Sequence, residues 1–164
     1  MTRVYLGLGS NAGESEAILR RAVEALRSIL SGLRASSVYR TKPRYVLEQP
    51  DFFNMAVVGE TELEPLALLS ATMEIEALHG RDRSREHFKG PRTLDIDILL
   101  YGALILHSDD LILPHPGLNE RAFALVPVLE LDPELHNPAD DSSLAGILAL
   151  LPDQGIYLHA PTSL

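Results

Sequence analysis

The chain has 164 residues, of which 46% are hydrophobic, and this suits one domain over residues 1–164 with a single sizeable core. Its formal net charge of −9 argues against a general nucleic-acid surface, so an anionic ligand needs a locally basic site or a metal ion. The absence of cysteine excludes disulfides, thiolate metal sites and cysteine nucleophiles.

The first half of the chain predicts strands and a helix in alternation. Residues 3–9 read as a strand that ends in Gly9-Ser10-Asn11. A helix is expected over 14–30, because its apolar residues recur at helical spacing along one face. A short strand over 34–39, a loop over 41–50 and a strand over 53–62 are expected to follow.

The second half opens with a proline in the first turn of a helix, where proline is tolerated, and that helix is expected to stop at Gly80. A polar loop and a strand over 94–100 come next, and residues 103–106 are expected to pair back as an extra strand. The proline-rich remainder predicts loops and short helices. A last helix is expected to be capped by Ser142 or Ser143 and to end at Leu150, and a short strand is expected over 156–159.

This order of elements predicts an α+β fold on the ferredoxin-like βαββαβ plan. Such a fold has a mainly antiparallel sheet with helices packed on it, here with the two main helices on one face. The amino terminus has too short an apolar run for a signal peptide, and no segment approaches the roughly 20 apolar residues of a membrane span. We therefore expect a cytoplasmic protein with neither membrane nor nucleic-acid partners.

The most informative motif is the run Gly-Pro-Arg-Thr-Leu-Asp-Ile-Asp over residues 90–97. In a strand, Asp95 and Asp97 point to one face, while the aliphatic residues between and around them point into a core. Two adjacent carboxylates favour a hard cation such as Mg²⁺, and Arg92 offers a planar donor fork for phosphate. The motif predicts metal-assisted phosphoryl chemistry; the alternative is a strand with two solvated acids on its outer face.

A glycine motif follows the first strand. Residues 7–12, Gly-Leu-Gly-Ser-Asn-Ala, match a loose dinucleotide-binding fingerprint, which needs an acidic residue about 20 positions on. No Asp or Glu lies between Glu24 and Glu48. The glycines are therefore better explained by a tight strand-to-helix turn than by a dinucleotide site.

The polar loop over 81–91 is rich in basic residues and is flanked by glycines. Beside Arg92 and the two aspartates, it is a candidate lid over a polyphosphate; alone, it would be an ordinary solvated loop.

Two further stretches carry aromatic residues. Phe52 and Asn54 share one face of a strand and could grip a planar heterocycle by stacking and hydrogen bonds; the alternative is a core aromatic with a strand-end cap. His115 lies between two prolines in a rigid turn, and Arg121 and Phe123 follow on a short helix. The alternative there is a surface turn with a packed phenylalanine.

These motifs occur in order along the chain, and together they closely resemble the 6-hydroxymethyl-7,8-dihydropterin pyrophosphokinases of folate biosynthesis. The resemblance extends to about residue 132, and residues 90–97 are highly specific to that family. The motifs that carry it are Gly9-Ser10-Asn11, Tyr39-Arg40-Thr41, residues 49–54, Gly80-Arg81, residues 90–97, and residues 114–123.

The resemblance implies that ATP gives its β,γ-pyrophosphoryl group to the hydroxymethyl oxygen of the pterin, leaving AMP. It implies that Asp95 and Asp97 hold two Mg²⁺ ions, and that Arg81 and Arg92 neutralise phosphate charge under a lid over 81–91. It also implies two ligand-binding groups: Thr41, Pro43, Phe52, Asn54 and Phe123 for the pterin, and Glu76, Arg83, Arg92, the backbone of Ile98, His115 and Arg121 for ATP.

The chain departs from the family pattern at Phe52, where a tyrosine is frequent, and at Asp110 and Ile112, where contacts to ATP are expected to be missing. We expect a monomer that acts on small molecules. Two other functions remain as alternatives: another Mg²⁺-dependent phosphoryl or nucleotidyl transferase, which would lack pterin affinity, and a non-catalytic binding module, which would have no need of both aspartates beside Arg92.

Overall fold

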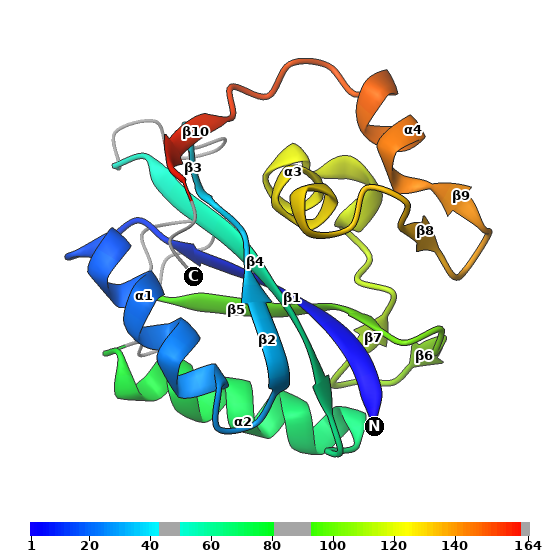
Figure 1. The fold of residues 1–164 in the computed structure, drawn as a ribbon, viewed down its shortest axis with the longest axis horizontal. Helices are drawn as coiled ribbons and strands as arrows, with labels where there is room; N and C mark the ends of the chain where they lie inside the picture. Colours follow the sequence, from blue (N-terminus) through cyan, green and yellow to red (C-terminus); the bar gives the residue numbers. More distant parts are fainter. Residues whose placement is uncertain (43–49, 81–92, 162–164) are drawn as a thin grey trace.

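The computed structural model describes residues 1–42, 50–80 and 93–161. Its main sheet has the strand order β10-β3-β4-β1-β5, with β2 also paired to β4, and the pairings within it are antiparallel. The expected α+β plan with a mainly antiparallel sheet is confirmed (Figure 1). The strands are β1 (Thr2–Ser10), β2 (Ser31–Ala35), β3 (Val38–Thr41), β4 (Phe52–Thr61), β5 (Asp95–Tyr101) and β10 (Tyr157–Ala160).

The strand expected over 34–39 is divided between β2 and β3. Ser36 interrupts it, because its hydroxyl accepts a hydrogen bond from the backbone N–H of Ala56 at 2.8 Å, while its own N–H donates to the Ala56 carbonyl at 2.9 Å. The Ser36 hydroxyl thus accepts the hydrogen bond from β4 that a backbone carbonyl would normally accept.

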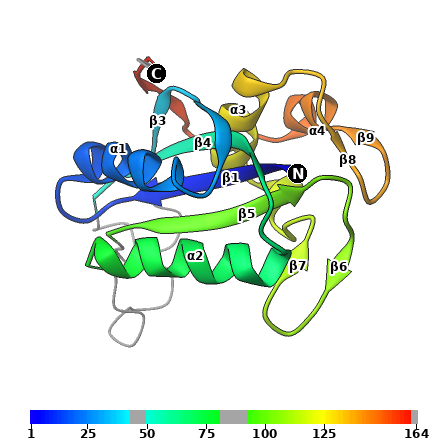
Figure 2. The same ribbon diagram turned by 60° about the horizontal axis from the view of Figure 1, so that its bottom comes forward.

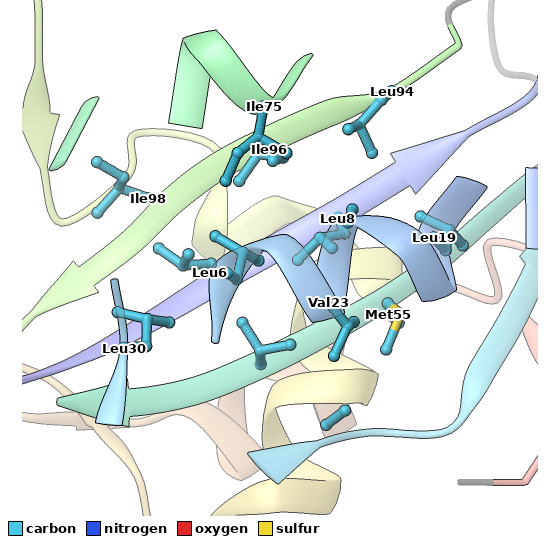
Figure 3. Packing of buried hydrophobic residues seen from close by; sticks show 14 of the residues in the cluster. Leu6, Leu8, Leu19, Val23, Leu30, Met55, Ile75, Leu94, Ile96 and Ile98 are labelled. Carbon is cyan, nitrogen blue, oxygen red and sulfur yellow. The ribbon is translucent and has the colours of Figure 1, made fainter. Parts of the chain in front are cut away.

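Helices α1 (Ser15–Leu26) and α2 (Pro65–Leu78) cover one face of the sheet, as expected (Figures 1 and 2). Their apolar residues pack with the inward-facing residues of the strands (Figure 3). α1 ends four residues before the expected Leu30, yet Leu30 is 3% exposed and remains in the core from the turn that follows the helix. The predicted helix was too long because Leu30 is apolar and falls at helical spacing, although it lies in the turn after the helix.

The opposite face of the sheet carries a second apolar cluster beneath α3 (Ala122–Leu131) and α4 (Leu144–Leu150). Between them lies a hairpin of β8 (His136–Asn137) and β9 (Ser142–Ser143), and a 3-10 turn, η2 (Leu118–Glu120), precedes α3. The predicted Ser143 cap is confirmed, since its hydroxyl accepts from the N–H of Gly146 at 3.2 Å.

The carboxyl end of α3 is tied to the sheet by two tyrosines. The Tyr5 hydroxyl donates to Asp132 at 2.8 Å, and the Tyr39 hydroxyl donates to Glu130 at 2.6 Å. Burial, reinforced by the hydrogen bond to Asp132 and its charge, raises the pKa of Tyr5 to about 12. Burial and Glu130 likewise raise the pKa of Tyr39. Both phenols are therefore neutral donors at physiological pH.

The extra strand expected over 103–106 does not pair back onto the sheet. Instead β6 (Leu106–His107) pairs with β7 (Ile112–Leu113) in a separate two-stranded sheet. The reason is that the outer edge of β5 is already occupied: the N–H of Ile96 donates to the Glu76 carboxylate at 2.8 Å, and the carbonyl of Leu99 accepts from the N–H of His115 at 3.0 Å.

None of the helices in the described part of the chain is long and apolar enough to cross a membrane.

Candidate active site

The two aspartates lie at the start of β5 and face away from α1 and α2. In the sheet register, Asp95 is opposite Gly9 and Asp97 is opposite Gly7, and Gly9 is in turn opposite Asn54. The residues between and beside the aspartates, Leu94, Ile96 and Ile98, are at most 4% exposed and belong to the core under the two helices. The alternation predicted from the sequence is confirmed.

Gly7 and Gly9 do not form the tight strand-to-helix turn that we expected. Both lie within β1, and neither has a positive φ. A Cβ on Gly9 would lie 3.0 Å from the Oδ1 of Asn54, and one on Gly7 would lie 3.3 Å from the Cδ1 of Leu99. Their missing side chains therefore leave an open floor between the aspartates of β5 and the amide of β4.

A pocket lies over this floor, and it gathers most of the predicted site residues within the described part of the chain. Its lining comes from β1, β3, β4, β5 and α3, together with Gln154 near the end of the chain. The predicted residues in it are Thr41, Phe52, Asn54, Asp95, Asp97, Arg121 and Phe123; the others are Gly7, Leu8, Gly9, Lys42, Met55, Leu99, Ala124 and Gln154.

Asn54 is buried, and its position is fixed by a hydrogen bond from its Nδ2 to the Thr41 Oγ1 at 3.0 Å. Phe52 lines the same pocket, whereas Phe53 points to the other face and meets the His159 ring edge-on, with 4.8 Å between centroids. The predicted division of this strand start between two faces is confirmed. The pocket therefore holds an aromatic ring beside a fixed amide.

Arg121 and Phe123 enter the pocket from the beginning of α3. The guanidinium carbon of Arg121 lies 5.7 Å from the centroid of the Phe123 ring. A Cβ on Gly117 would lie 2.5 Å from the Arg121 Nε, so a glycine is needed there for the guanidinium to lie against the backbone. The result is a cation and a second aromatic ring in the same cavity as the two carboxylates.

His115 stands beside the carboxylates, with its Nε2 3.9 Å from the Oδ1 of Asp97. Its Nδ1 accepts a hydrogen bond from the N–H of Gly117 at 3.0 Å, which assigns the neutral ring a proton on Nε2, toward Asp97. Burial lowers the pKa of His115, the charge of Arg121 lowers it further, and Asp95 opposes both. A neutral imidazole whose Nε2 proton is on the side of Asp97 is therefore favoured.

Two predicted residues are on the other side of β5. Glu76 of α2 is 1% exposed, and its carboxylate accepts from the N–H of Ile96, between the two aspartates. The Ile98 side chain is buried in the core, so the backbone is the part of this residue left for a ligand. Pro43, Arg81, Arg83 and Arg92, together with the candidate lid over 81–91, lie outside the described residues.

The sequence analysis did not identify the glycine floor or Gln154 as parts of the pocket. Two glycines at alternate positions of an apolar strand do carry a signal, because they remove side chains from one face only. No local sequence pattern marks Gln154, because it reaches the pocket only when the end of the chain packs against α3.

The donor set suits a magnesium ion. The two carboxylates are partly exposed to the pocket and provide oxygen ligands, which Mg²⁺ prefers, while Mg²⁺ usually keeps other positions for water and substrate phosphates. Within residues 1–42, 50–80 and 93–161, no group of three or more His, Asp or Glu side chains is gathered for a metal. The two carboxylates fit an ion whose remaining positions are filled by water or a ligand.

The chain is similar to known proteins over most of its length. The family model described as 7,8-dihydro-6-hydroxymethylpterin-pyrophosphokinase matches residues 5–133. Over 138 residues the chain is 46% identical to 2-amino-4-hydroxy-6-hydroxymethyldihydropteridine pyrophosphokinase of Methylorubrum extorquens, covering 82% of this chain and 85% of that protein. The protein of the same name from Bacillus subtilis is 41% identical over 137 residues, covering 82% of this chain and 81% of the relative.

A longer relative, folic acid synthesis protein fol1 of Schizosaccharomyces pombe, is 40% identical over 159 residues. The match covers 95% of this chain but 21% of that protein, so the chain spans about a fifth of its length. The fold alone is also shared with a solved structure titled "Crystal Structure Analysis of the HPPK-DHPS in complex with substrates". Its TM-score is 0.69 at 16% identity, and the match covers 90% of this chain and 43% of that one.

The match defines a class of enzymes, the pyrophosphokinases, which are diphosphotransferases. The chain belongs to the 7,8-dihydro-6-hydroxymethylpterin-pyrophosphokinase family of folate biosynthesis, and the resemblance seen in the sequence is thereby confirmed.

Proposed function

We propose that this protein transfers pyrophosphate from ATP to the hydroxymethyl group of 6-hydroxymethyl-7,8-dihydropterin, giving AMP and the pterin diphosphate. The observation that carries the proposal is the composition of the pocket. It joins two carboxylates suited to a divalent cation with an aromatic ring and a fixed amide suited to a flat heterocycle. A phosphoryl donor and a pterin could therefore meet in one cavity.

The pterin is proposed to lie between Phe52 and Phe123, which approach the pocket from β4 and from α3. Asn54 is proposed to bond the edge of the pterin ring. Its bond to Thr41 holds the amide in one orientation, so the ring edge meets a donor and an acceptor in a defined order. The loop that begins at Thr41, with Pro43, is proposed to add backbone contacts.

The polyphosphate is proposed to lie toward β5. Asp95 and Asp97 would hold two Mg²⁺ ions there, and bound Mg²⁺ neutralises phosphate charge and favours attack by the pterin hydroxyl. Arg121 faces the same cavity as a cation, and the Nε2 of His115 lies 3.9 Å from Asp97, so both residues are proposed to lie near the phosphates of ATP. Arg81 and Arg92 are proposed to stabilise the charge that develops on the transferring group.

The remaining proposed contacts are to ATP. They are Glu76, Arg83 and the backbone of Ile98. Glu76 and Ile98 lie on the side of β5 that faces α2, so they are proposed to contact the nucleoside end of ATP at the strand edge and not the reacting phosphates.

Incubation of the protein with ATP, Mg²⁺ and 6-hydroxymethyl-7,8-dihydropterin tests the proposal, with nucleotide products separated by chromatography. AMP that forms only when both the pterin and Mg²⁺ are present is the expected result. ADP in place of AMP would indicate an ordinary kinase on the same fold. Absence of turnover with intact pterin binding would favour a binding module.

A further inference from the structure

Gln154 is a pocket-lining residue from the segment that joins α4 to β10. This segment lies beyond residues 5–133, which the family model matches. It passes over α3 on its way back to the sheet (Figure 1). The family match therefore does not explain why a glutamine from this segment lines the proposed substrate pocket.

The Gln154 amide makes two hydrogen bonds to the backbone on either side of Arg121. Its Oε1 accepts from the N–H of Ala122 at 2.9 Å, and its Nε2 donates to the carbonyl of Glu120 at 2.9 Å. Ala122 is the first residue of α3, where the N–H groups have no partner within the helix. Arg121 precedes it and cannot cap the helix, because a guanidinium accepts no hydrogen bond.

Both ends of the segment are anchored, so Gln154 is held in place. On one side, α4 is docked by Leu144, which is fully buried. On the other, β10 pairs with β3, and His159 packs edge-on against Phe53. Next to the glutamine, Asp153 accepts the N–H of Gly155 at 2.8 Å, in a turn where Gly155 has φ of 73°.

We infer that Gln154 is a positioning residue for the reaction, which sets the Arg121 cation and the Phe123 ring at the mouth of the pocket. It acts by fixing the backbone at Glu120 and Ala122, and hence the direction in which α3 begins. This inference rests on the proposed function for its effect on the pterin, but its structural part stands without it.

The variant Gln154→Met tests the inference, because methionine keeps a side chain of similar length against the pocket and removes both hydrogen bonds. Tyr5→Phe is the matched control, since it removes one hydrogen bond from the opposite end of the same helix, outside the pocket. The readouts are KM for the pterin and kcat from AMP formation, and hydrogen exchange at the Ala122 amide.

Gln154→Met is expected to raise KM for the pterin about tenfold, roughly the loss of one net hydrogen bond, with kcat within about threefold of wild type. Its Ala122 amide is expected to exchange about tenfold faster. Tyr5→Phe is expected to leave KM and this exchange rate unchanged. A wild-type KM in Gln154→Met, or an equal rise in both variants, would overturn the inference.

The two proposals fail in different ways. Absence of AMP with the wild-type protein would refute the proposed function, whereas the exchange rate of Ala122 still decides the role of Gln154. A wild-type exchange rate in Gln154→Met would refute that role whatever the activity.

Discussion

The glycine floor of the pocket can be tested by adding a single methyl group in Gly9→Ala. The new Cβ would lie 3.0 Å from the Asn54 Oδ1, which is tighter than an ordinary contact, so the amide must move by a few tenths of an ångström. That movement strains the 3.0 Å hydrogen bond from Asn54 to Thr41 and misaligns the group proposed to read the pterin edge. We expect a loss of pterin affinity.

Gly9→Ala is expected to change the affinity for the pterin much more than the free energy of unfolding. A misaligned hydrogen bond from the Asn54 amide to the pterin, as proposed, costs about 1–3 kcal/mol of binding free energy, which corresponds to roughly a 5- to 150-fold weaker Kd. The backbone of Gly9 is not in the left-handed region, so alanine in this strand gains about 0.5–1 kcal/mol that offsets part of the strain. The free energy of unfolding is therefore expected to change by less than about 1 kcal/mol.

Gly59→Ala is the matched control on the neighbouring strand. Its Cβ would lie 3.0 Å from the Cβ of Leu30 and 3.2 Å from the carbonyl of Ser31, and neither atom is the end of a flexible side chain. This variant is expected to lose about 1–3 kcal/mol of stability and to keep its pterin affinity.

Fluorescence titration with the pterin and urea unfolding of both variants make the comparison. Wild-type affinity in Gly9→Ala, or a loss of stability equal to that of Gly59→Ala, would refute the account of the floor.

Four further predictions concern the site and its support. Asp97→Ala is expected to lower AMP formation at least about 10²-fold while unfolding stays close to wild type; near-normal turnover would contradict the metal assignment. Arg92→Ala is expected to lower kcat far more than pterin affinity, and steady-state kinetics with pterin titration would show the reverse if its role were in binding. Phe123→Ala is expected to weaken pterin binding about tenfold by loss of a stacking face, measured by calorimetry, and an unchanged Kd would remove Phe123 from the ring site. Tyr5→Phe is expected to lower the free energy of unfolding by about 0.5–1.5 kcal/mol at neutral pH. Because folding raises the pKa of Tyr5 from 10.0 to about 12, the stabilisation by this hydroxyl is complete below pH 10 and disappears as the pH rises through 12. Urea unfolding should therefore show a difference in stability between variant and wild type at pH 8 that becomes smaller above pH 11.

The features that the sequence predicted correctly are those set by short-range periodicity. The alternation across Asp95 and Asp97 follows from the pleat of a single strand, and its outcome depends little on the neighbouring strands. The same holds for the start of α2 at a proline and for the Ser143 cap, which are local backbone effects. These elements were expected with bounds within a residue or two of those observed.

The features that were missed depend on which strands become neighbours. The role of Gly9 exists because β4 and β5 flank β1, which brings Asn54 and Asp95 level with it. The edge of β5 was unavailable to an extra strand because Glu76 and His115 had already taken its hydrogen bonds. Such facts follow from the assembled sheet, and no window of the sequence contains them.

The arrangement of β1 explains why the candidate active-site pocket forms at this end of the sheet. One face of β1 carries Val4, Leu6 and Leu8, all buried in the core under the two larger helices. The other face carries Tyr5, which packs in the cluster beneath α3, and then Gly7 and Gly9, which have no side chains.

A helix packed on a sheet needs side chains to fill the space between the two layers. Beneath the body of α3 that space is filled, but at the start of the helix the strand below it is bare, and the helix begins there with Arg121 and Phe123. The cavity is thus the region that both layers leave empty, and Gln154 holds the first turn of α3 at its rim. A larger residue at either glycine would close the pocket from below, and a loosened helix start would alter it from above, so the two proposed variants, Gly9→Ala and Gln154→Met, perturb the same cavity from opposite sides.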